Sequence, residues 1–160
     1  MKKRILALAA LMLFVLPLEL PAGEVYDLDP LMDRYEAMKQ LRDSRFASDF
    51  DNPESREKFL GYKRLLMDCQ ERIKSTAHLV QLHNIFAARE GLEPSTEFMS
   101  DGIVDQVPKF TAQTRRDMRV IDEDLDEMAH DDLYDFGHEV VIMLDGYVDE
   151  IQAIAEGVRQ

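Results

Sequence analysis

His83 is the residue of this sequence best suited to bind a metal ion or a haem iron, because helical spacing places it among apolar residues. A neutral imidazole in the core of a helical bundle can ligate either group, with a methionine as a soft second ligand. The sequence has no Cys-x-x-Cys-His motif and no second histidine at an equivalent position. We therefore interpret His83 as a hydrogen-bonded core residue and expect no cofactor. The alternative is a haem- or metal-binding carrier centred on His83.

Two pairs of an acid and a histidine, Glu127-x-x-His130 and Asp135-x-x-His138, have the spacing of metal ligands on one helix face. Two Glu-x-x-His repeats mark the di-metal carboxylate bundles, where they come from two separate helices. Here the two pairs lie only eight residues apart. His138 also falls away from the apolar positions around it. We interpret both pairs as surface residues.

Eight acids lie between residues 122 and 135: Asp122, Glu123, Asp124, Asp126, Glu127, Asp131, Asp132 and Asp135. Asp122, Asp124 and Asp126 are spaced as at the start of a calcium loop, but the sixth position is Glu127 instead of glycine and the twelfth is Leu133 instead of glutamate. Three interpretations stay open: a solvated helix face, a docking surface for a basic partner, and a low-affinity cation site. We take these acids, with Tyr134 and Phe136, as the candidate partner-binding surface. The spacing also allows Phe136 to turn inward.

The other charged or reactive residues do not form a catalytic motif. Cys69 is predicted to be buried, and the sequence lacks the Gly-x-Ser-x-Gly and His-Glu-x-x-His motifs and any phosphate-binding glycine loop. Arg115, Arg116 and Arg119 precede the acidic run, and we expect them to pair with neighbouring acids at about 0.2–0.5 kcal/mol per pair. We predict that the protein is not an enzyme.

The elements that position these residues are predicted to be helices only. Asn52 followed by Pro53 suits a helix start, as does Pro94, and Pro108 is expected to open a further helix. No stretch alternates apolar and polar residues as a strand does. The predicted helices are 30–47, 53–90, 95–106, 108–129 and 132–158.

The second predicted helix has the clearest pattern, an apolar residue at every seventh position. These residues are Phe59, Leu66, Ile73, Val80 and Ala87. The companion positions, three residues after the first four, are Tyr62, Cys69, Thr76 and His83, while Glu57, Arg64, Glu71 and His78 are predicted to face away. Because Leu82 and Ile85 fall outside this stripe, we expect the last turns to be covered on more than one side. The fold class is predicted to be all-α: an antiparallel bundle of about four long helices plus one short helix, 95–106.

The beginning of the sequence predicts export. Residues 2–4 are basic, residues 5–16 are apolar, and Pro17 ends the apolar run. This run is shorter than the roughly 20 residues of a membrane-spanning helix. We predict a cleaved signal peptide over residues 1–22, in preference to an uncleaved anchor, followed by a single helical domain over 23–160. The expected location is the bacterial periplasm or the medium, without a stable membrane anchor.

Charge restricts the class of partner. The formal net charge is −13, and loss of the predicted leader would lower it to about −15. So much negative charge argues against nucleic acid and anionic lipid surfaces, and suits a basic protein, a cationic peptide or a divalent cation. A simpler interpretation is that the charge only keeps an exported protein soluble. The single cysteine excludes an internal disulfide.

The sequence therefore favours non-catalytic binding to a protein partner, of the accessory, chaperone-like or inhibitor and immunity type. Two alternatives are the carrier centred on His83 and a structural envelope protein without a defined ligand. The sequence is compatible with either a monomer or a homodimer.

Overall fold

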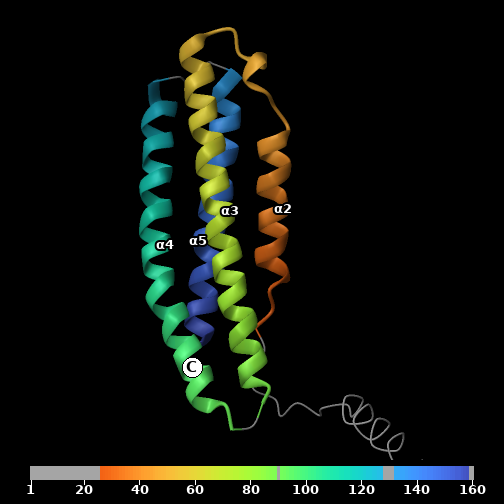
Figure 1. Ribbon diagram of the computed structural model, residues 1–160. Coiled ribbons are helices and arrows are strands. Elements are labelled where there is room, and N and C mark those ends of the chain that lie inside the picture. Colours follow the sequence, from red (N-terminus) through yellow and green to blue (C-terminus); the bar gives the residue numbers. More distant parts are fainter. Residues whose placement is uncertain (1–25, 90, 128–131, 159–160) are drawn as a thin grey trace, which may run out of the picture.

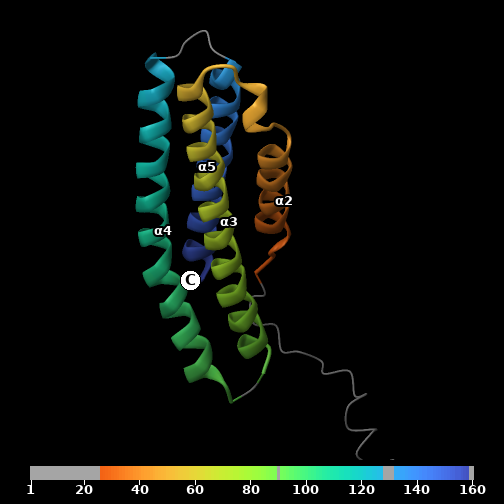
Figure 2. The same ribbon diagram turned by 45° about the horizontal axis from the view of Figure 1, so that its top comes forward.

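The protein is described by a computed structural model over residues 26–89, 91–127 and 132–158 (Figure 1). In this part of the chain all regular structure is helical. Four long helices, α2 (Asp29–Asp43), α3 (Pro53–Ala87), α4 (Glu93–Glu127) and α5 (Asp132–Val158), are accompanied by a short 3-10 helix, η1 (Ala47–Asp49). Figures 1 and 2 show the long helices packed side by side, with successive helices running in opposite directions. The all-α bundle is thus confirmed, while the predicted signal peptide lies outside the described residues.

The start of α3 follows a local sequence signal, whereas α2 ends earlier than predicted. At the start of α3, the Asn52 side chain accepts a hydrogen bond from the backbone N–H of Glu54 at 2.9 Å, and Pro53 is the first helical residue. In α2, the hydroxyl group of Ser44 donates to the carbonyl of Leu41 at 2.6 Å. This bond satisfies one of the terminal carbonyls of α2, which ends at Asp43 and not at the predicted residue 47.

The prediction of two helices over 95–106 and 108–129 is wrong. The structure has one helix, α4, with Pro108 inside it. Proline has no N–H to donate to the carbonyl of Val104, which weakens the helix at this point. The buried face nevertheless continues across the proline, from Ile103 and Val107 to Thr111. Packing against α3 and α5 therefore keeps α4 continuous, and Figure 2 shows a bend along its length.

The register predicted for α3 is confirmed. The first four seam residues and their companions are buried, and the four residues predicted to face away are exposed. Two details differ: Ala87 is half-buried, and Ile85 is 42% exposed, so the expected covering of Ile85 is wrong. This end of α3 extends past α2 (Figure 1), and Ile85 is partly exposed there. The facing core of α5 consists of Leu133, Phe136, Val140, Leu144, Tyr147, Val148, Ile151 and Ala155.

Within the described residues, no helix combines the length and the apolar character that crossing a membrane requires.

Candidate functional site

The predicted acidic surface lies where α4 ends and α5 begins, at one end of the bundle (Figure 1). The side chains of Asp122, Glu123, Asp126 and Asp135 are exposed. Among the described residues none of these four carboxylates forms an ion pair. Asp131 lies outside the described residues, as do the side chains of Glu127 and Asp132.

Asp124 has a structural role instead. Its carboxylate accepts a hydrogen bond from the Tyr62 hydroxyl at 3.0 Å and forms an ion pair with Lys58 at 3.1 Å. Both partners belong to α3, so Asp124 holds α4 against α3. Burial raises the pKa of Tyr62, and the hydrogen bond to Asp124 raises it further. The phenol is therefore neutral at physiological pH and acts as the donor in this contact.

The two aromatic residues of the predicted surface separate. Tyr134 is 37% exposed, and its ring stacks on that of exposed His138, with centroids 6.2 Å apart. Phe136 is 1% exposed and packs on the Phe59 ring at 4.9 Å, so its assignment to the surface is wrong. Its spacing from Leu133 and Val140 places it on the buried side of α5. We define the acidic surface as Asp122, Glu123, Asp126, Tyr134 and Asp135.

A buried polar network was missed by sequence reasoning. The Arg72 guanidinium of α3 donates to the Thr114 hydroxyl and to the Asp117 carboxylate, each at 2.9 Å. Gln113 donates to the other oxygen of Asp117 at 2.8 Å. Asp117 is 6% exposed. Helical spacing in the sequence could have revealed this network, because it places Thr114 and Asp117 on the same face of α4 as Ile121.

Cys69 belongs to the same interior. Burial raises the pKa of its thiol to about 12, although Arg72 opposes the shift. A thiol is a nucleophile only as the thiolate. Cys69 is therefore protonated and unreactive at physiological pH.

His83 packs on the N-terminal segment of the described chain. It is 6% exposed, and its ring centroid lies 5.2 Å from that of Tyr26. The neighbouring Asn84 fixes this segment, accepting from the Tyr26 backbone N–H at 3.0 Å and donating to its carbonyl at 2.9 Å. His83 Nδ1 is buried and has no hydrogen-bond partner among the described residues. In that part of the chain, no three His, Cys, Asp or Glu side chains gather to hold a metal ion.

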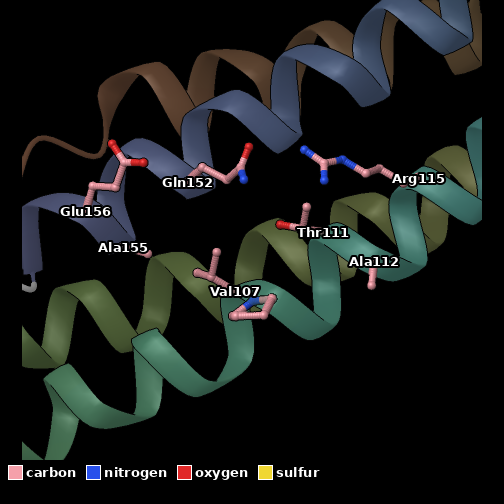
Figure 3. Close-up of a pocket in the computed structure, with 8 residues that line it drawn as sticks. Val107, Thr111, Ala112, Arg115, Gln152, Ala155 and Glu156 are labelled. Atoms are coloured by element: carbon pink, nitrogen blue, oxygen red, sulfur yellow. The ribbon is translucent and has the colours of Figure 1, made fainter.

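A pocket of about 260 Å³ opens between α4 and α5 (Figure 3). Its apolar lining comes from Val107, Pro108, Ala112 and Ala155, and its polar lining from Thr111, Arg115, Gln152 and Glu156. The expectation that the three arginines of α4 pair with acids is wrong for the described residues. Arg116 donates to Gln113 at 2.6 Å, and neither Arg115 nor Arg119 has an ion pair there. Sequence reasoning missed this pocket because its residues come from distant segments.

Comparisons with protein-family models, with curated proteins and with solved structures found no match to this chain.

Proposed function

We propose that the protein is an exported, non-catalytic binding protein whose acidic surface docks a basic segment of a partner protein. The observation that carries the proposal is a set of four exposed carboxylates at the end of the bundle that also carries the exposed Tyr134, none of them in an ion pair among the described residues. Each carboxylate is held on a helix that the bundle core fixes in place. The binding groups are thus arranged before the partner arrives, which lowers the entropic cost of association.

Charge and aromatic character act at different stages of this binding. Like charges close together repel one another. A cationic partner that approaches the acidic surface offsets this repulsion and is therefore attracted to it. Such attraction mainly raises the association rate and selects the sign of the partner's charge. Tyr134 supplies apolar surface, because its amphipathic ring can be buried in the contact. The proposed partner presents lysine or arginine residues beside an apolar one.

Cross-linking capture from cells tests the proposal. A C-terminally tagged full-length chain is exported, cross-linked in place, purified and identified with its partner by mass spectrometry. The matched variant neutralises the acidic surface with Asp122→Asn, Glu123→Gln, Asp126→Asn and Asp135→Asn. We expect one dominant partner with a basic surface, lost in this variant and weakened as salt screens the charges.

The control variant neutralises four exposed acids elsewhere, by Glu97→Gln, Asp101→Asn, Asp145→Asn and Asp149→Asn. It removes the same net charge and leaves the acidic surface intact, so it should keep the partner. Equal loss in both variants would show that only net charge matters. An empty capture from folded wild-type protein would contradict the proposal.

The second candidate is a haem or metal carrier, favoured by the buried Nδ1 of His83, which has no hydrogen-bond partner in the part of the chain that the structure describes. Under this alternative, protein purified without added ligand contains a chromophore or a metal. His83→Ala abolishes that signal while neutralisation of the acidic surface leaves it unchanged. Colourless and metal-free wild-type protein would exclude this candidate.

A further inference from the structure

The pocket between α4 and α5 carries opposite charges at its two ends. Figure 3 shows Arg115 and Gln152 near one end and Glu156 near the other. The Arg115 side chain extends from α4 along the pocket, so that its guanidinium lies on the side of the Gln152 amide group of α5 (Figure 3). Glu156 lies one helical turn further along α5. We infer that this pocket binds a small zwitterion, with its carboxylate at Arg115 and its ammonium group at Glu156.

Arg115 is suited to receive the carboxylate. Its guanidinium has no ion pair among the described residues, although the chain carries 32 acids. A guanidinium binds a carboxylate through two parallel hydrogen bonds. In Figure 3 the amide group of Gln152 is directed toward Arg115, where its NH₂ group can donate to the same anion. This end of the pocket therefore offers donors from both helices.

Thr111 is the second observation that indicates a ligand. It is 5% exposed, and its Oγ1 atom is buried without a hydrogen-bond partner among the described residues. Leaving a buried hydroxyl group unpaired is unfavourable. In Figure 3 its side chain projects from α4 toward α5, with the methyl group on the side of Arg115 and Gln152. Threonine in a helix has two accessible χ1 rotamers, so the hydroxyl group can replace the methyl group there and bond a ligand.

The size and charge of the pocket set the class of ligand. Sites for drug-sized molecules begin near roughly 300 Å³, and this pocket is slightly smaller. Glu156 repels a simple dianion and attracts a cation, whereas Arg115 has the opposite preference. The apolar floor of Val107 and Ala155 between them suits a short aliphatic chain. A molecule with an ammonium group and a carboxylate joined by a few methylene groups satisfies all three requirements.

Nuclear magnetic resonance titration of the full-length mature protein tests this inference. The probes are glycine, β-alanine, γ-aminobutyrate and 6-aminohexanoate, which have the same two charges at increasing separation. Butyrate and butylamine carry one charge each. We expect saturable shifts of the Val107, Thr111 and Ala155 amides with at least one zwitterion at millimolar concentration, and weaker binding of both single-charge analogues.

Three variants assign the contacts. Arg115→Gln and Glu156→Gln should each weaken binding by about tenfold or more, the usual effect of losing one charged contact. Thr111→Val should weaken binding without lowering thermal stability, because the unpaired hydroxyl group is removed. Arg119→Gln, which removes an exposed arginine of α4 outside the pocket, is the matched control and should bind as the wild type does.

The inference is overturned if no zwitterion gives saturable shifts at these residues. It is also overturned if butyrate or butylamine binds as tightly as the best zwitterion, or if Arg115→Gln and Glu156→Gln leave binding unchanged. The site is independent of the acidic surface, since no residue is shared and the readout needs no protein partner. Failure here therefore leaves the proposed partner binding untouched, and the reverse also holds.

Discussion

Arg72 and Asp117 show how this interior tolerates charge. Their side chains are only 14% and 8% exposed, so each loses most of its hydration on folding. Their attraction offsets that loss only when the remaining hydrogen-bonding capacity is also satisfied. Thr114 and Gln113 supply those bonds. The pair therefore links α3 to α4 in a geometry that depends on both partners being present.

Asp117→Ala should lower the free energy of unfolding by about 3–5 kcal/mol, because it leaves the Arg72 guanidinium buried without its counter-charge. Urea denaturation followed by circular dichroism measures the change. Asp122→Ala, at an exposed site five residues further along α4, is the control and should change stability by less than about 0.5 kcal/mol. Equal effects of the two substitutions would show that the buried network adds no more to the free energy of unfolding than an exposed acid does.

Alkaline pH should destabilise the fold through Cys69. The thiol pKa is about 12 in the folded protein and 9.0 without the effect of folding. Between these values the unfolded chain releases a proton that the folded one keeps, so the free energy of unfolding falls as pH rises above 9. Cys69→Ala should make this fall shallower in urea denaturation at pH values from about 8 to 9.5, where tyrosine is still mostly protonated. If the free energy of unfolding fell as steeply with pH in Cys69→Ala as in the wild type, the raised pKa of the Cys69 thiol would be contradicted.

At the scale of elements, α3 and α5 each contact the other three long helices. The apolar residue at every seventh position of α3 marks the side of this helix that is buried in those contacts. Val80 is fully buried, and His78 is exposed on the outer face. The same pattern predicts which residues of this helix tolerate truncation.

Val80→Ala should lower the free energy of unfolding by about 1–3 kcal/mol, since it removes two methyl groups from the core. His78→Ala should leave stability within about 0.5 kcal/mol of wild type. Thermal or urea unfolding of the two variants compares them directly. A loss in His78→Ala as large as that in Val80→Ala would mean that the register of α3 is wrong.

Helix existence and register could be predicted from the sequence because apolar periodicity reports directly on burial. The joining of 95–106 and 108–129 could not, because Pro108 disfavours a helix locally and only packing of the whole of α4 overrides it. The same distinction, between local spacing and packing of helices, applies to the candidate site. The exposure of Asp122 and Asp126 follows from helical spacing, whereas the pairing of Asp124 with Lys58 depends on how two helices meet.

At the scale of the whole molecule, the two ends of the bundle differ. One end carries the acidic surface, and the opposite end, where α4 begins, carries Phe98 with 70% of its surface exposed (Figure 1). Between them, the core and the buried ion pair keep the helices in fixed register. The molecule thus presents its acidic surface at one end of the packed bundle, as the proposed electrostatically steered binding requires.

Site-specific photo-cross-linking in cells tests the central claim, that a partner docks at the acidic surface. A benzophenone amino acid replaces Tyr134 in one variant and Phe98 in the other, so that the same reactive group samples the two ends. We predict a single cross-linked partner with a basic surface from position 134 and none from position 98, with the product decreasing as salt increases. Cross-linking from position 98 alone, or none from position 134 in folded exported protein, would contradict the account.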